Sequence, residues 1–128
     1  MNEQRILVGV FDLLNVGHLS QINSVAGAGV DIHVVVVSDD GVKATLGTST
    51  YLPTHERAAI VSQMRNVDEV SITGPESNWK LPVGDALFVD ATLFHEGSHL
   101  GGVFAKATAV TATRRPAHPA LVATQAVA

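Results

Sequence analysis

The stretch that decides the fold is Gly9-Val10-Phe11-Asp12-Leu13-Leu14-Asn15-Val16-Gly17-His18, which directly follows the apolar run Ile6-Leu7-Val8. The apolar run predicts a buried strand, the next residues a turn, and Gly17-His18 the opening of a helix. Backbone N–H groups of such a turn, together with the helix dipole, can bind phosphate oxygens. In open α/β sheets, ligands bind beyond the carboxyl ends of the strands. The stretch therefore predicts a phosphate site in an α/β fold.

The composition is that of a well-buried globular protein. The 128 residues are 46% apolar and 16% charged, which predicts one domain over residues 1–128. The net charge of −4 argues against a nucleic-acid partner. We expect no membrane span, because no apolar run approaches ~18 residues. The N-terminal residues lack a signal-peptide pattern, so a cytoplasmic location is expected. The absence of cysteine excludes disulfides and thiolate metal ligands.

Apolar, β-branched runs alternate with helical segments along the chain. Strands are predicted at Arg5–Val10, Asp31–Ser38, Val67–Thr73, Ala86–Val89 and Thr108–Thr113. Helices are predicted at Gly17–Ala28, with Leu19, Ile22, Val25 and Ala26 on its buried face, and from Thr54, as N-cap, to about Asn66, with Arg65 in its last turn. Asp39–Pro53 and Gly74–Pro82 are predicted loops, and the tail from about Pro116 has no clear pattern. The alternation predicts a doubly wound, mainly parallel five-stranded sheet flanked by helices, a Rossmann-like α/β fold.

The opening stretch resembles the Gly-x-Phe-Asp-x-x-His-x-Gly-His motif of the cytidylyltransferase-like nucleotidyltransferases, of the glycerol-3-phosphate and ethanolamine-phosphate type. The likeness continues at Glu56-Arg57-Ala58-Ala59-Ile60-Val61 and at Asn66-Val67-Asp68-Glu69-Val70, so it covers about residues 5–90. The resemblance implies transfer of a cytidylyl group from CTP, with Mg²⁺, to a small phosphorylated or phosphonylated alcohol, with release of pyrophosphate. It also implies a homodimer.

The chemistry of the motif assigns His18 a charged hydrogen bond to the phosphate under attack, which would stabilise the growing negative charge. The resemblance adds Asn15 and Arg57 to His18 as catalytic residues. It further implies nucleotide or phosphate contacts from Gly9, Val10, Phe11, Asp12, Gly17, Lys43 and Arg114, with Asp12 supporting the turn.

Several positions depart from the family pattern. Asn15 replaces the first histidine of the motif, and an amide carries no positive charge. The expected lysines before the Glu-Arg helix are reduced to Lys43. Ala91-Thr92-Leu93-Phe94 stands in place of a run that helps to hold the nucleotide, and the late hydroxyl-rich motif is reduced to Arg114. The alternative hypothesis is therefore a catalytically impaired relative that binds a nucleotide or supports a partner subunit.

A third hypothesis rests on His95-Glu96-Gly97-Ser98-His99, which matches the His-Glu-x-x-His pattern of zinc hydrolases. On a helix, His95 and His99 would share a face and could bind zinc, with Glu96 as general base. Glycines at 97, 101 and 102 disfavour a helix there. The segment is therefore a weak metal candidate, and zinc is not the expected cofactor.

Overall fold

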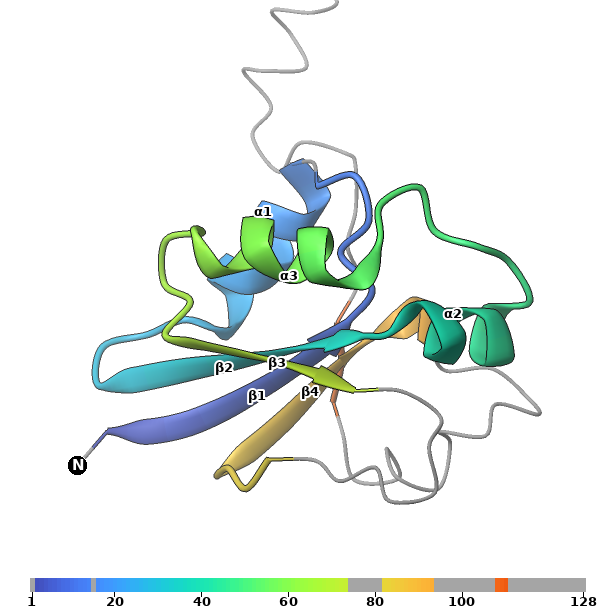
Figure 1. The fold of residues 1–128 in the computed structure, drawn as a ribbon. Helices are drawn as coiled ribbons and strands as arrows, with labels where there is room; N and C mark the ends of the chain where they lie inside the picture. Colours follow the sequence, from blue (N-terminus) through green and yellow to red (C-terminus); the bar gives the residue numbers. More distant parts are fainter. Residues whose placement is uncertain (1, 15, 74–81, 94–107, 111–128) are drawn as a thin grey trace, which may run out of the picture.

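The computed structural model describes residues 2–14, 16–73, 82–93 and 108–110 (Figure 1). Its elements, in chain order, are β1 (Glu3–Gly9), α1 (Val16–Val25), β2 (Val30–Val37), α2 (Asp39–Leu46), α3 (Thr54–Ser62), β3 (Glu69–Thr73), β4 (Ala86–Asp90), a 3₁₀ turn η1 (Ala91–Leu93) and β5 (Thr108–Val110). Each of the predicted strands is present, and the ends of the first four differ from the prediction by no more than two residues. Residues 111–113 of the predicted fifth strand lie outside the described residues. The predicted tail from Pro116 lies outside the described residues.

The strands form one sheet in the order β3-β2-β1-β4-β5, and every neighbouring pair is parallel. The chain runs outward from β1 through β2 to β3, and then returns to the other side of β1 with β4. The order therefore reverses between β1 and β4. Helices α1 and α3 lie together over one face of the sheet, as Figure 1 shows. This is the Rossmann-like, doubly wound arrangement that the sequence predicts.

The sheet is buried on both faces because successive side chains of a strand point to opposite sides. On one face, Leu7 and Val34 pack with Ile22 of α1 and Val61 of α3. On the other face, Ile6, Val8, Val35 and Val37 pack with Val42 of α2 and with Leu93. The continuous apolar runs of β1 and β2 thus supply two cores at once.

Helix α2 corrects the prediction of a loop over Asp39–Pro53. The Ser38 hydroxyl accepts a hydrogen bond from the Gly41 N–H at 3.1 Å, and Asp39 and Asp40 lie in the first turn, where the dipole favours carboxylates. Gly47 ends the helix in the left-handed conformation at φ 75°. The glycines were interpreted as loop residues, but Gly41 is buried inside the helix and Gly47 is its cap.

Helix α3 is shorter than predicted and begins differently. It ends at Ser62, so Arg65 lies beyond its last turn. Pro53 occupies the N-cap position without a side-chain bond. The Thr54 hydroxyl instead accepts a hydrogen bond from the Asp39 N–H at 2.9 Å, so Thr54 joins α3 to α2 rather than capping its own helix.

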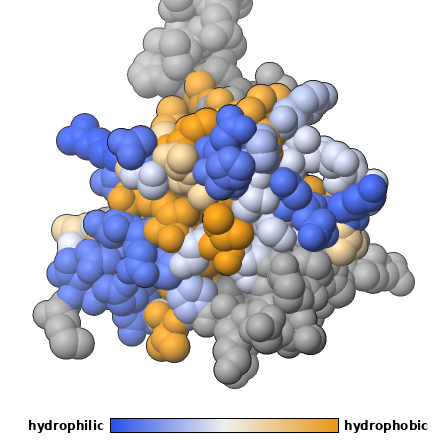
Figure 2. Space-filling model, in the orientation of Figure 1, coloured by the Kyte–Doolittle hydropathy of each residue, from blue (hydrophilic) through white to orange (hydrophobic). Residues whose placement is uncertain are grey.

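The predicted apolar face of α1 is correct at Ile22 and Val25, which are 1% and 0% exposed, but wrong at Leu19. Leu19 is 44% exposed, and Gln21 takes a buried place instead. The Gln21 Nε2 donates to the Val110 carbonyl of β5 at 3.0 Å, whereas its buried Oε1 has no hydrogen-bond partner among the described residues. Figure 2 shows apolar surface over the part of the molecule that α1 and α3 occupy, with hydrophilic side chains on both sides of it. None of the described helices is long and apolar enough to cross a membrane.

Candidate functional site

The turn after β1 is strained and tightly packed. Phe11 and Leu13 both have positive φ angles, 55° and 48°, which non-glycine residues rarely adopt. The Phe11 ring is buried and lies so close to Gly9 that a Cβ there would be 2.8 Å from Cε2 of the ring. Gly9 is therefore required by this close approach. Strained backbone of this kind is concentrated at ligand-binding sites.

His18 lies in the first turn of α1, directly after this turn. Its ring centroid is 5.8 Å from that of Phe11, with the ring planes tilted by 51°. Burial lowers the pKa of His18 below its ordinary value, and the carboxylates of Asp90 and Asp12 oppose that shift. The imidazole is therefore mainly neutral at neutral pH before an anion binds.

A cavity of about 380 Å³ opens beside His18, where the strand order reverses between β1 and β4. Four parts of the chain surround it: the turn after β1, the start of α1, the end of β4 with η1, and the segment from α2 to α3. The lining residues are Val10, Asp12, His18, Val42, Leu46, Thr48, Ser49, Thr50, Tyr51, Asp90 and Thr92. The structure therefore brings the predicted residues Val10, Asp12 and His18 to one site, at the position where α/β sheets bind ligands.

Asp12 joins the turn to the segment between α2 and α3. One of its carboxylate oxygens accepts a hydrogen bond from the Tyr51 N–H at 2.7 Å, and the other accepts from the Leu52 N–H at 3.0 Å. These bonds link residues 39 and 40 positions apart in the sequence. Asp12 therefore holds one wall of the cavity against another.

Arg57 of α3 is fully buried and connects the carboxyl ends of the neighbouring strands β1 and β2. Its Nη1 donates to the Val10 carbonyl after β1 at 2.8 Å and to the Val37 carbonyl of β2 at 2.7 Å. Its Nε donates to the Leu52 carbonyl at 2.9 Å. Arg57 thus supplies donors to carbonyls at the strand ends, and the Leu52 carbonyl accepts a second hydrogen bond from the Thr50 hydroxyl.

The Nη2 of Arg57 donates to Asp39 Oδ1 at 2.7 Å and to the Thr54 hydroxyl at 3.4 Å. The bond from Arg57 is the main reason why the pKa of Asp39 lies below its ordinary value. These contacts are those of a positioning residue, because they hold the loop, α2 and both strands around the cavity. The predicted contact of Arg57 with a substrate stays a prediction.

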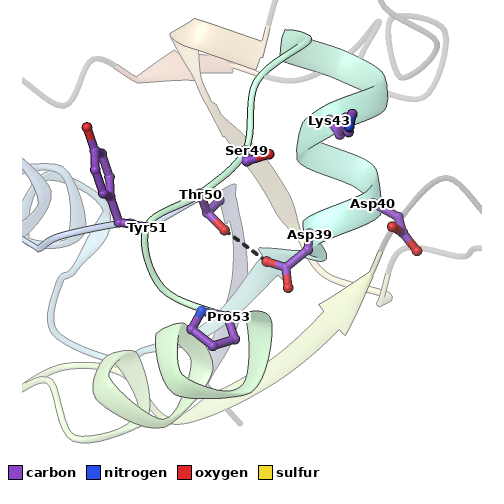
Figure 3. A pocket seen from close by; sticks show the side chains of 7 residues that line it. All are labelled: Asp39, Asp40, Lys43, Ser49, Thr50, Tyr51 and Pro53. Atoms are coloured by element: carbon purple, nitrogen blue, oxygen red, sulfur yellow. Dashed lines mark hydrogen bonds between the residues drawn. The ribbon is translucent and has the colours of Figure 1, made fainter.

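Lys43 lies on α2 and lines a second cavity, of about 390 Å³ (Figure 3). The other lining residues are Asp39, Asp40, Ser49, Thr50, Tyr51 and Pro53. Ser49, Thr50 and Tyr51 also line the cavity beside His18, so the segment that carries them lies between the two. The structure thus places Lys43 in the neighbouring cavity, with two carboxylates, rather than beside His18.

Other predicted site residues cannot be placed. Asn15, Arg114 and the metal candidates His95, Glu96 and His99 lie outside the described residues. Within the described ranges, no group of three His, Asp or Glu side chains is arranged to hold a metal ion.

Sequence reasoning missed Asp90 and Thr92. Asp90 is only 5% exposed at the end of β4, and its Oδ1 accepts hydrogen bonds from the N–H and the hydroxyl of Thr92, both at 3.0 Å. The available signal was a carboxylate directly after the predicted strand Ala86–Val89. It could be used only once β4 was known to lie next to β1.

The strand order of this parallel sheet reverses beside the first strand, which is followed by a strained turn and a histidine at a helix start. This is the architecture of an α/β nucleotide-binding domain. The model of the family described as Cytidylyltransferase-like matches residues 6–91. The chain therefore belongs to the cytidylyltransferase-like nucleotidyltransferase family.

Similar curated proteins include two FAD synthases. That of Pyrococcus abyssi is 36% identical over 72 residues, which are 56% of this chain and 49% of the relative. That of Thermococcus onnurineus is 35% identical over 72 residues, 56% of this chain and 48% of the relative. This chain thus spans about half the length of these relatives. The bifunctional protein HldE of Koribacter versatilis is 38% identical over 74 residues, 56% of this chain and 15% of that protein.

The fold is also found in a solved structure, the lipopolysaccharide core biosynthesis protein from Thermoplasma volcanium. The two structures match with a TM-score of 0.61 at 17% identity, over 89% of this chain and 98% of the other. At this identity the likeness concerns the fold alone.

Proposed function

We propose that this chain transfers a nucleotidyl group from a nucleoside triphosphate to a small phosphorylated or phosphonylated acceptor, with release of pyrophosphate. The observation that carries the proposal is the cavity at the β1–β4 reversal, which combines a strained phosphate-type turn with the imidazole of His18. A cavity of about 380 Å³ falls within the usual range of small-molecule sites.

The mechanism that this geometry supports is in-line attack on the α-phosphorus. An acceptor oxygen forms the new P–O bond while the bond to the pyrophosphate oxygen breaks. The backbone of the turn and the N-terminus of α1 orient the phosphates. His18 takes up a proton from the solvent when the triphosphate binds, and the imidazolium donates a hydrogen bond to the phosphate oxygens on which negative charge grows.

Mg²⁺ would accompany the triphosphate and neutralise part of its charge. Both oxygens of Asp12 already accept backbone hydrogen bonds, so this carboxylate is occupied with the loop. Asp90 is the lining carboxylate that could assist in holding the ion, because both hydrogen bonds from Thr92 go to its Oδ1. The phosphates themselves would supply the remaining ligands.

The donor nucleotide is the point on which the family resemblance and the relatives differ. The resemblance to glycerol-3-phosphate and ethanolamine-phosphate cytidylyltransferases favours CTP. The two relatives are called FAD synthases, and FAD contains an adenylyl group, which favours ATP as the donor to test beside CTP. A homodimer and a cytoplasmic location stay predictions.

The direct test is to incubate the pure protein with each nucleoside triphosphate, Mg²⁺ and a panel of phosphorylated acceptors, and to follow pyrophosphate release. We expect release with CTP or ATP that depends on the acceptor. Calorimetry with the same triphosphates measures binding separately. If no triphosphate binds, the proposal is wrong.

A second candidate function is nucleotide binding without transfer. The observations that favour it are Asn15 in the place of a histidine and the position of Lys43 in the neighbouring cavity. In that case a triphosphate binds without turnover. Restoration of turnover by Asn15→His would then identify the loss of the first histidine as the reason.

We predict that triphosphate affinity falls as the pH rises from about 6 to 8, in part through His18. The pKa of His18 is lowered in the free protein, and a bound phosphate would raise it again, so binding takes up a proton. Affinity then decreases with increasing pH by at most about tenfold per pH unit, the limit for one proton. Calorimetry across this range should show that the affinity of His18→Gln depends less on pH than that of the wild type. The comparison of the two proteins also corrects for titration of the nucleotide itself. Equal slopes would contradict the prediction.

A further inference from the structure

The segment between α2 and α3 combines a fixed backbone with one exposed aromatic side chain. The Tyr51 N–H and the Leu52 N–H are bound by Asp12 at 2.7 and 3.0 Å. The Leu52 carbonyl accepts from Arg57 at 2.9 Å and from the Thr50 hydroxyl at 2.9 Å. The backbone on both sides of Tyr51 is therefore held by buried or half-buried groups.

The Tyr51 side chain, by contrast, is 82% exposed. Figure 3 shows its ring extending from the segment on the side away from Asp39 and Lys43. The described residues give its hydroxyl no hydrogen bond. Tyr51 nevertheless lines both cavities, the one beside His18 and the one beside Lys43. An aromatic ring with only two side-chain torsions, on a fixed backbone at the edge of a cavity, loses little entropy when a planar ligand covers it.

We propose, on the basis of the proposed function, that Tyr51 is a substrate-contacting residue whose ring stacks on a planar heteroaromatic ring of the bound substrate. His18 and the turn bind the phosphates, and such contacts do not distinguish one phosphorylated substrate from another. Tyr51 lines the same cavity from the segment between α2 and α3 and supplies an apolar, planar surface for the ring. The ring belongs either to the nucleobase of the triphosphate or to a heteroaromatic acceptor.

The test compares Tyr51→Ala and Tyr51→Phe with the wild type by calorimetry, using CTP, ATP, flavin mononucleotide and inorganic tripolyphosphate as probes. Stacking of a base on an aromatic side chain corresponds to a loss of about fivefold or more when the ring is removed. We expect Tyr51→Ala to weaken binding of a ring-bearing probe by at least that factor and to leave tripolyphosphate unchanged. Tyr51→Phe should retain most of the affinity.

The substitution should not disturb the fold, because Asp12 binds the backbone and not the side chain of residue 51. An unchanged thermal midpoint verifies this. Val83→Ala is the matched control: Val83 is 96% exposed and lies just before β4, at the opposite end of the sheet from the cavity. It should bind every probe as the wild type does.

The results also separate the two sources of the ring. A loss confined to CTP or ATP assigns the nucleobase, and a loss confined to the flavin assigns the acceptor. Since Tyr51 is the only tyrosine of the chain, upfield shifts of its ring protons on addition of the probe report stacking directly. Equal binding by Tyr51→Ala and wild type, or an equal loss for tripolyphosphate, overturns this inference and leaves the proposed function standing. If the wild type binds neither nucleotide nor flavin, both fail.

Discussion

Replacement of Arg57 by alanine is expected to lower the free energy of unfolding by about 3–5 kcal/mol. The substitution removes the Arg57 donors from the carbonyls of Val10, Val37 and Leu52, and leaves Asp39 without its closest cation. The Leu52 carbonyl keeps its hydrogen bond from the Thr50 hydroxyl. The substitution also empties a fully buried volume. Since small domains are stable by about 5–15 kcal/mol, this is a large share of the total.

Urea denaturation followed by circular dichroism measures the change. Arg65→Ala is the matched control, because Arg65 is exposed and lies beyond the end of α3. It should change stability by less than about 0.5 kcal/mol. If Arg57→Ala does not fold, Arg57→Lys serves instead: a single ammonium cannot reproduce the fork of bonds, so an intermediate loss is expected. Stability equal to the wild type in both Arg57 variants would show that the hydrogen bonds of Arg57 are not needed for the stability of the fold.

Replacement of His18 by alanine is expected to lower the rate of nucleotidyl transfer by about 10²–10³-fold, the usual effect of removing one donor to a developing charge. The effect should fall mainly on kcat, because the backbone of the turn continues to bind the phosphates. Because burial lowers the pKa of His18 in the free protein, the imidazole gains its proton when the phosphates bind beside it. Steady-state measurement of pyrophosphate release tests the prediction.

His55→Ala is the matched control for the loss of an imidazole, since His55 is exposed on α3 and does not line the cavity. It should leave kcat unchanged. His18→Gln keeps a hydrogen-bond donor without the charge, and we expect a rate between those of alanine and wild type. A kcat for His18→Ala close to that of the wild type would remove His18 from the mechanism.

The fold could be predicted from the sequence because its main determinants are local. The apolar runs at Ile6–Val8 and Val34–Val37 are short and continuous, which is typical of strands covered on both faces. The turn that follows the first strand places His18 at a helix start, and the structure confirms that position. Helix α2 was missed although Ser38 and Gly47 are ordinary cap residues, because the loop interpretation gave more weight to the glycines than to the caps.

The site was predictable only where it consists of neighbours in the sequence. Val10, Asp12 and His18 belong to one short stretch and do meet at one cavity. The partners of Asp12 are 39 and 40 positions away, and no periodicity links an aspartate to the N–H groups of a distant loop. Asp90 joins the cavity only because β4 pairs with β1.

By itself, then, the sequence determined the parallel α/β class and the turn with His18, since both follow from apolar periodicity and from the residue order of one short stretch. Only the tertiary structure decided that Arg57 is buried and binds the strand-end carbonyls, that Lys43 lines the neighbouring cavity, and that Tyr51 is exposed beside the site. Arg57 binds the carbonyl of Val10, which is 47 positions away in the sequence. Buried carbonyls at the strand ends need a hydrogen-bond donor, and that donor can come from any part of the chain that folding brings close. Such long-range needs arise only once the strands are assembled.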